Sequence, residues 1–224
     1  MRRLKISFLL FLCLAGLTAC SRSNDTDNLW LPIKGLSWGM DKEKVTSLLE
    51  GNGVTLQQEK GTVPNRYILS KVQTCWGFKG TVKLDFKSFS EGGTAYLTAF
   101  GFYPEEAEEY TLSKKLSKAF GVESSAPPGN AAKGLQWESK AALSDIPDKD
   151  IRQRAKDLIE VIWGNIPFKE TASEMSRPLV TAQYTPSEQA NIKSSIYLRG
   201  ERASVAVFAK DDNISRAIDG SSVK

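Results

Sequence analysis

Hydrophobic and polar residues alternate along two stretches of this chain, a pattern that is typical of half-buried β-strands. The first stretch covers residues 81–86 and 96–102, with the turn Ser90-Glu91-Gly92-Gly93 between them, and it predicts an antiparallel hairpin. One face of this hairpin is expected to carry Val82, Leu84, Phe86, Tyr96, Thr98, Phe100 and Phe102. We expect this face to be core, although the aromatic run at residues 100–103 would also suit a binding platform.

The second alternating stretch predicts three short strands near the C-terminus. They begin at Val180, Ile192 and Val205, and residues 199–202 form the hairpin turn between the last two. Residues 54–56 and 67–76 have a less regular extended pattern, and we expect them to add two strands earlier in the chain.

Two segments place hydrophobic residues every three or four positions, as amphipathic helices do. The first should begin at the N-cap Asp41, with Met40 and Val45 as a hydrophobic staple, and end at Gly51 in the left-handed conformation. The other follows Pro147 and carries Ile151, Ala155, Leu158, Ile159 and Ile162 on one face. We expect that face to pack in the core; a membrane surface or a partner helix is the alternative.

A further helix is predicted between Pro104, which suits the first helical position, and Gly121, which ends it. Its apolar stripe consists of Ala107, Leu112, Leu116, Ala119 and Phe120. Its first turn contains Glu105, Glu106, Glu108 and Glu109. These could be catalytic carboxylates, but the positive end of the helix dipole accounts for them without any chemistry.

Together these elements predict an α+β fold in which antiparallel sheet packs against about three helices. Residues 122–134 are rich in Ser, Ala, Pro and Gly and mark an internal linker or loop. The chain is therefore expected to form either one domain or two intimate halves, residues 29–121 and 135–210. Residues 211–224 are polar and are expected to be a mobile tail.

The N-terminus has a different pattern, in which Arg2, Arg3 and Lys5 precede an apolar run at residues 6–17. The run is too short for a stable bilayer-spanning helix but has the length of a signal-peptide core. The sequence Leu17-Thr18-Ala19-Cys20 resembles the lipobox of bacterial lipoproteins.

This resemblance implies that residues 1–19 are removed, that Cys20 is lipidated, and that residues 20–28 form a flexible tether. Ser21 replaces the aspartate that resembles an inner-membrane retention signal, which favours a periplasm-facing position on the outer membrane if the organism has two membranes. The alternatives are an ordinary cysteine after an ordinary signal sequence and an uncleaved anchor.

Residues 35–49 contain the pattern Trp-Gly-Met-Asp-x-x-x-Val-x-x-Leu-Leu. This pattern resembles the opening of small periplasmic lipoprotein modules of the outer-membrane assembly type (SmpA/BamE-like). In that family the turn starts a helix ahead of a meander of strands, and the resemblance implies an α+β module that contacts other envelope proteins.

Composition narrows the possible functions. Removing Arg2, Arg3 and Lys5 lowers the formal charge from +4 to +1, so nothing suggests nucleic-acid binding. The absence of histidine excludes Ser-His-Asp and Cys-His catalysis and His-ligated zinc. Cys75 is the one cysteine left after Cys13 is removed and Cys20 is lipidated, and we expect it to be a small buried hydrophobic residue.

The sequence contains no Gly-rich phosphate loop, zinc signature or nucleophile elbow, and Asp211-Asp212-Asn213 lacks the spacing of a calcium loop. We therefore expect no catalytic residue, metal or cofactor, and a domain that binds another protein of the periplasm or envelope. One version is an assembly protein, and the alternative is an immunity lipoprotein that blocks a delivered toxin such as a lipase or wall hydrolase. A hydrolase built on a Ser-Lys pair or two carboxylates is the third possibility. The predicted contact residues are Arg199, Glu201 and Arg202, at a hairpin tip.

Overall fold

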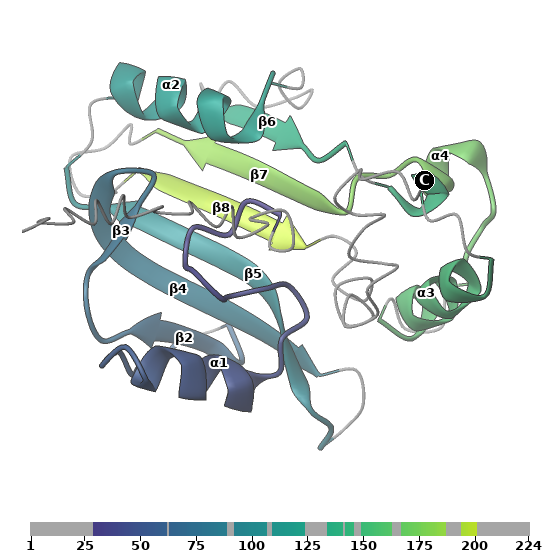
Figure 1. Ribbon diagram of the computed structural model, residues 1–224, viewed down its shortest axis with the longest axis horizontal. Coiled ribbons are helices and arrows are strands. Elements are labelled where there is room, and N and C mark those ends of the chain that lie inside the picture. Colours follow the sequence, from purple (N-terminus) through teal and green to yellow (C-terminus); the bar gives the residue numbers. More distant parts are fainter. Residues whose placement is uncertain are drawn as a thin grey trace, which may run out of the picture.

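The computed structural model describes residues 29–61, 63–88, 92–106, 109–123, 134–140, 142–145, 149–162, 167–186 and 194–200. Within these residues the chain forms an α+β fold with an open antiparallel sheet of eight strands, which confirms the predicted fold class (Figure 1). The strands are β1 (Leu56–Gln58), β2 (Arg66–Leu69), β3 (Gln73–Cys75), β4 (Phe78–Ser88), β5 (Ala95–Pro104), β6 (Leu135–Glu138), β7 (Val180–Thr185) and β8 (Ser195–Gly200). The helices are α1 (Lys42–Glu50), α2 (Glu109–Phe120), α3 (Lys149–Ile162) and the single turn α4 (Ala172–Met175).

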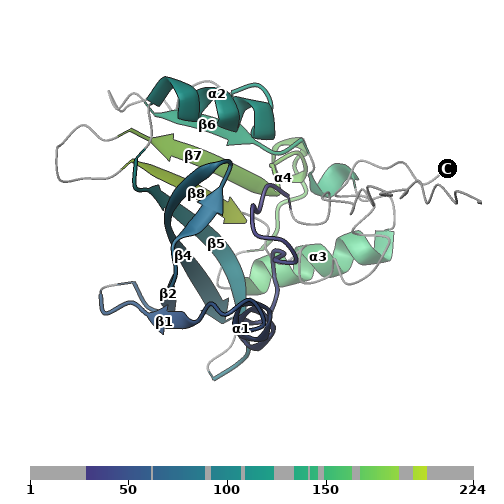
Figure 2. The ribbon, with the colours of Figure 1, turned by 60° about the vertical axis from the view of Figure 1, so that its left-hand side comes forward.

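The sheet runs in the order β1-β2-β4-β5-β8-β7-β6, and β3 also pairs with β4. β8 is the last described strand in the chain, yet it lies between β5 and β7. The strands before and after the predicted linker therefore belong to one continuous sheet. Figures 1 and 2 show α1 at the β1–β2 end of this sheet and α2 beside β6.

The inner face of the sheet carries the core. Directly opposed residues of antiparallel strands point to the same face, so the register defines rows of side chains across the sheet. One inner row consists of Leu84, Phe100, Leu198, Ala182 and Trp137, and the next consists of Val82, Phe102, Ile196, Tyr184 and Leu135. All of these residues are buried except Leu135, which is half-buried. The core prediction for the aromatic run is confirmed for Phe100 and Phe102, which are 0% exposed.

Helix α1 begins as predicted and ends differently. The Asp41 side chain accepts a hydrogen bond from the Lys44 backbone N–H at 2.8 Å, and Val45 and Leu49 are buried. Gly51 has a φ of −57°, so the expectation of a left-handed residue there is wrong. The chain continues for one more turn, and the left-handed residue is Gly53, with a φ of 69°.

The single strand predicted over residues 67–76 is two strands, β2 and β3, which pair with different parts of β4. β3 and β4 are joined by the two-residue turn Trp76-Gly77, in which both residues have positive φ, 50° and 85°. Two consecutive positive φ values are typical of the type I′ turn, whose twist matches that of the flanking strands.

A β-bulge between Asp85 and Phe86 changes the predicted face of β5. Beyond the bulge the register shifts, so that Leu97 is paired with Phe86 and is 0% exposed. Tyr96 and Thr98 were expected on the core face but are half-buried, because one extra residue reverses the alternation.

The start of α2 also differs from the prediction. Pro104 is the last residue of β5, and the helix begins at Glu109. Leu112, Leu116 and Phe120 are buried as expected, whereas Ala119 is exposed. Gly121, with a φ of 95°, follows the helix as expected. Helix α3 lies where the amphipathic pattern predicts it.

Several predictions lie outside the described residues: the signal peptide, Cys20, the tether at 20–28, the strand beginning at Val205, and the tail at 211–224. Among the helices that are described, none is both long and apolar enough to cross a bilayer.

Candidate functional site

The outer face of the sheet carries a second set of rows, made by the residues that alternate with the core. One outer row consists of Arg66, Asp85, Ala99, Arg199, Thr181 and Glu138. The neighbouring row consists of Ile68, Lys83, Gly101, Tyr197, Gln183 and Gln136. Each row therefore crosses six strands, and each has a small residue, Ala99 or Gly101, at its β5 position.

Gly101 has no side chain, which leaves room for aromatic rings from either side of it on β5. A methyl group added at Gly101 would be 3.6 Å from Tyr197 Cδ2 and 3.3 Å from Tyr103 Cε2, so the two rings flank the glycine. The Tyr197 hydroxyl reaches β4, where it donates a hydrogen bond to Asp85 Oδ2 at 2.8 Å. The missing side chain at Gly101 thus allows a β8 residue to bond a β4 residue across the intervening strand.

Asp85 is held from its other side by Arg66. Arg66 Nε donates to Asp85 Oδ1 at 2.5 Å, and Arg66 Nη2 donates to Asp85 Oδ2 at 2.6 Å. This bidentate geometry is the strong form of the Arg–carboxylate pair. The hydrogen bond to Asp85 holds the pKa of the Arg66 guanidinium above its usual range, so the guanidinium stays charged.

Burial, together with the negative charge of Asp85 and the hydrogen bond to it, raises the pKa of Tyr197 to about 12. The tyrosine is therefore a neutral donor at any physiological pH. We refer to Arg66, Asp85 and Tyr197 as the outer-face cluster. Because its bonds link β2, β4 and β8, the cluster fixes the orientation of the Tyr197 ring.

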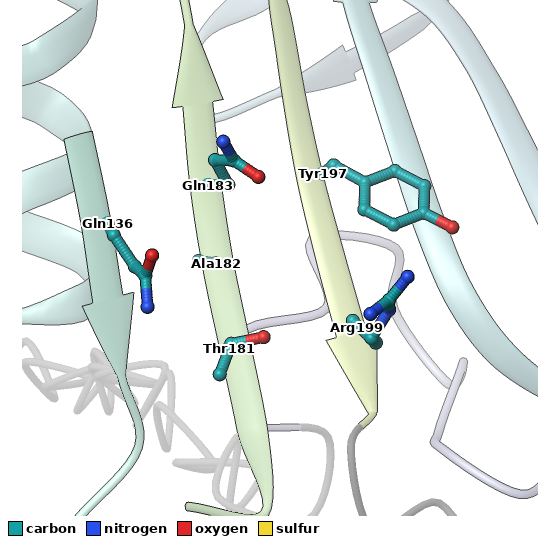
Figure 3. Close-up of a pocket in the computed structure, with 6 residues that line it drawn as sticks. All are labelled: Gln136, Thr181, Ala182, Gln183, Tyr197 and Arg199. Carbon is teal, nitrogen blue, oxygen red and sulfur yellow. The ribbon is translucent and has the colours of Figure 1, made fainter. Parts of the chain in front are cut away.

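On the other side of β8 the sheet is hollowed. The β6–β8 hollow has a volume of about 260 Å³ and is lined by Gln136, Thr181, Ala182, Gln183, Tyr197 and Arg199. Figure 3 shows the Tyr197 ring directed away from β7, toward β5, so the ring does not fill the space above β7. Gln183 and Arg199 are exposed, and Gln136, Thr181 and Tyr197 are half-buried.

The hollow is lined mainly by polar side chains. Its side chains include two amides, two hydroxyls and one guanidinium, all of which are hydrogen-bond donors, and the Tyr197 hydroxyl donates to Asp85. Its one charged residue, Arg199, is a permanent cation, and a guanidinium does not act as a proton acceptor at neutral pH.

Of the predicted contact residues, Arg199 is an exposed residue within β8, and Glu201 and Arg202 lie outside the described residues. The expectation that Arg199 belongs to a hairpin turn is wrong, because its backbone pairs with both Ala99 and Thr181. It is one of the residues that line the hollow, and Figure 3 shows its guanidinium on the β5 side of β8.

Sequence reasoning did not find the outer-face cluster. Arg66 and Tyr197 stand 19 and 112 residues from Asp85 along the chain, so their meeting depends on strand order. The alternation Ile196-Tyr197-Leu198-Arg199 was the available signal, since it places Tyr197 and Arg199 on the face opposite the core.

Cys75 is the cysteine that could act as a nucleophile in the folded domain. It is 0% exposed, as expected for a packing residue. Burial raises the pKa of its thiol to about 12, which suppresses the reactive thiolate. In the described part of the chain, no three His, Cys, Asp or Glu residues are grouped so as to hold a metal ion.

No protein-family model, curated protein or solved structure matches this chain.

Proposed function

We propose that this chain is a lipid-anchored envelope protein whose folded domain binds another protein and performs no chemistry. The observation that carries the proposal is the outer face of β6, β7 and β8. Its side chains are those of Gln136, Glu138, Thr181, Gln183, Thr185, Ser195, Tyr197 and Arg199. None of these residues is buried.

The composition of this surface supports a protein partner. Protein interfaces are enriched in tyrosine and arginine and depleted of lysine and glutamate, relative to other surfaces. The outer side of β4 carries Lys79, Lys83 and Asp85, whereas the outer sides of β6–β8 carry no lysine and one glutamate, Glu138. The outer side of β4 is therefore richer in charged residues than the outer side of β6–β8, which is the difference expected if β6–β8 bind a partner.

The absence of chemistry is supported by the state of the groups that could perform it. Asp85 is committed to the ion pair with Arg66, and Cys75 is buried with a raised pKa. A general base or nucleophile needs access to a substrate and a suitable pKa, and neither group combines the two.

Lipidation at Cys20 fits a binding role. The tether of residues 20–28 could reach at most about 30 Å from the membrane at 3.3–3.6 Å per residue. Confinement near the membrane raises the effective concentration of the domain for any partner that arrives there, without new contacts.

Site-specific photo-crosslinking in cells tests the proposal. A photoreactive residue is placed at Gln183, on the outer face of β7, and as a matched control at Lys118, on the exposed side of α2. We expect one discrete protein adduct from position 183 and none from position 118. An adduct with an envelope assembly protein would select the assembly version, and an adduct with a delivered toxin would select the immunity version.

The proposal is overturned if neither position gives an adduct while esterase, amidase or glycosidase screens detect turnover. That turnover would have to be abolished by one Ser, Lys, Asp or Glu substitution.

A further inference from the structure

We infer that the exposed side of α2 rests on an anionic phospholipid surface through its lysines, so that the outer face of β6–β8 points away from that surface. This inference rests on the proposed function, because it takes the lipid anchor at Cys20 as given. It adds a second membrane contact and the orientation of the anchored domain.

The exposed side of α2 carries charge of one sign. Lys114, Lys115 and Lys118 are exposed, and the helix contains no acid after Glu109, its first residue. Among the ion pairs of the described residues, none includes a lysine of α2. The sequences of α1 and α3, in contrast, mix acidic and basic residues. A basic amphipathic helix is typical of segments that lie on a membrane surface.

The exposed side also carries apolar groups that suit a membrane interface. Lys114 and Lys118 are four residues apart, so they are neighbours on the helix surface. Tyr110 precedes them by the same interval and is 71% exposed, and Val122, just after the helix, is 95% exposed. Tyrosine is enriched at membrane–water interfaces, because its ring is apolar and its hydroxyl is polar.

Not all three lysines are equally available. The Lys115 ammonium lies 4.5 Å from the centroid of the Phe78 ring, which is a cation–π distance. Lys114 and Lys118 are therefore the lysines on which the contact depends. Glu123 lies beside this end of the helix, where it accepts a hydrogen bond from Ser117 Oγ at 3.1 Å, and the lysines outweigh its single charge.

The proposed tether joins the folded domain beside α2. Trp30 packs against Phe120, the last residue of the helix, with 4.8 Å between the ring centroids. The Leu29 carbonyl accepts a hydrogen bond from Trp38 Nε1 at 3.1 Å, which holds the start of the described chain in place. Because the tether ends at this point, the lipid at Cys20 would keep the C-terminal end of α2 within its reach of about 30 Å.

The packing of α2 fixes what the contact does to the rest of the domain. Phe120 contacts Trp137 of β6, with 5.4 Å between the ring centroids, and Trp137 belongs to an inner row of the sheet. Helix α2 therefore lies on the core side of β6, and the β6–β8 hollow opens on the other side. When α2 rests on the membrane, the hollow faces the compartment from which a partner arrives.

A contact through so few lysines is sufficient because the domain is already anchored. Each lysine near an anionic surface strengthens the attraction by about fivefold, and salt screens it. The anchor makes the contact intramolecular, so its effective concentration is high without further interactions.

The test measures how well α2 is shielded by lipid. Val122→Cys is labelled with a fluorophore in the purified lipidated protein, since Cys75 is buried and Cys20 is acylated. The protein is added to vesicles of phosphatidylcholine or of phosphatidylcholine with phosphatidylglycerol, and acrylamide, a neutral quencher, reports exposure to water. We expect weaker quenching at position 122 in the anionic vesicles. Gln183→Cys, on the outer face of β7, should be quenched alike in both.

Charge variants show whether the lysines cause the shielding. Lys114→Gln with Lys118→Gln should weaken the contact by about fivefold for each residue, and quenching at position 122 should rise accordingly. The two arginine substitutions at these positions keep the charge and should keep the shielding. Lys60→Gln is the matched control, since it removes an exposed lysine between β1 and β2, at the other end of the sheet from β6. Circular dichroism checks that each variant is folded.

The inference is overturned if position 122 is quenched alike in both kinds of vesicle, or if Lys60→Gln raises quenching as much as the double α2 variant. It is also overturned if a photoreactive residue at position 118 gives a protein adduct in cells, which would assign this side of α2 to an acidic protein.

Failure of the inference is distinct from failure of the proposed function. A cellular adduct at position 183 with equal quenching in the two kinds of vesicle would keep the protein partner and reject the membrane contact of α2. Shielding of position 122 in anionic vesicles without an adduct at position 183 would keep the membrane contact and reject the protein partner.

Discussion

Tyr197 illustrates how a missing side chain on one strand, that of Gly101 on β5, determines where a side chain of the next strand can lie. Gly101 leaves room for the ring to cross β5, and the Tyr197 hydroxyl donates a hydrogen bond to Asp85. These hydrogen bonds involve only Tyr197, Asp85 and Arg66, but they keep the Tyr197 ring away from the space above β7.

The ionisation of Tyr197 gives a pH-dependent prediction. Its pKa is raised from 10.0 to about 12 by burial and by the charge of Asp85 and the hydrogen bond to it, so folding favours the neutral form. A pKa raised by folding contributes stability that is complete below pH 10 and is lost as the pH rises through about 12. Tyr197→Phe should therefore show a smaller loss of stability between these pH values than the wild type.

Ultraviolet titration checks this directly. The difference between the wild-type and Tyr197→Phe curves should be one tyrosine that ionises near pH 12. A difference curve centred at pH 10 would show that the hydroxyl is neither buried nor held by Asp85.

Cys75 is a second residue whose environment gives a measurable expectation. It is 0% exposed, so Cys75→Ala should lower the free energy of unfolding by about 1–2 kcal/mol through lost packing. Urea denaturation measures the change. The native thiol should react with a bulky thiol reagent only after unfolding, and rapid labelling of the folded protein would contradict a packing role.

At the scale of single elements, the N-cap of α1 is the clearest case of local control. Asp41 accepts the Lys44 N–H at 2.8 Å and also pairs with the exposed Lys44 side chain at 2.7 Å. Asp41→Ala should cost about 1 kcal/mol, because an unpaired helix-start donor is left.

Asp41→Asn is the matched control for this variant, since it keeps the cap and removes only the ion pair, which contributes little on an exposed surface. Thermal unfolding of both variants should show a clear loss for alanine and almost none for asparagine. Equal losses would mean that the ion pair, and not the cap, holds the helix start.

The elements that sequence reasoning predicted correctly are those controlled by neighbours in the chain. The cap at Asp41 and the alternation of Val82, Leu84 and Phe86 need only local information, and the structure confirms both. The strand assignment of Pro104 and the bulge at Asp85 depend on pairing between β4 and β5, which the local pattern does not contain.

The same division applies to the candidate site. Arg199 could be selected from the sequence as an exposed charge, but its place within β8 depends on pairing with β5 and β7. The hollow needs the register of β6, β7 and β8 and the small residue at position 101 of a distant strand. Contacts between side chains that are brought together by strand order cannot be predicted from the sequence pattern of one segment.

At the scale of the whole molecule, the proposed lipid anchor at Cys20 would determine where the protein acts, and it can be tested by substitution. Cys20→Ala should lose labelling by a palmitate analogue and should move the protein from the membrane fraction to the soluble fraction. Several acyl chains, at about 0.8 kcal/mol per buried methylene, account for firm retention of the wild type. Equal labelling of the two proteins would reject the lipobox interpretation.

The position of β8 between β5 and β7 has a consequence for how the chain reaches this structure. Residues 99–102 form their second ladder of hydrogen bonds with residues 196–199, which lie far along the chain. Because closing so long a loop costs entropy, we expect closure of the sheet to be a late step of folding. Until then β5 is a bare edge that carries Phe100 and Phe102 beside it, a template for pairing with other chains. We therefore expect the edge of β5 to stay exposed during folding until β8 pairs with it, and a factor that shields hydrophobic edges would act before that step.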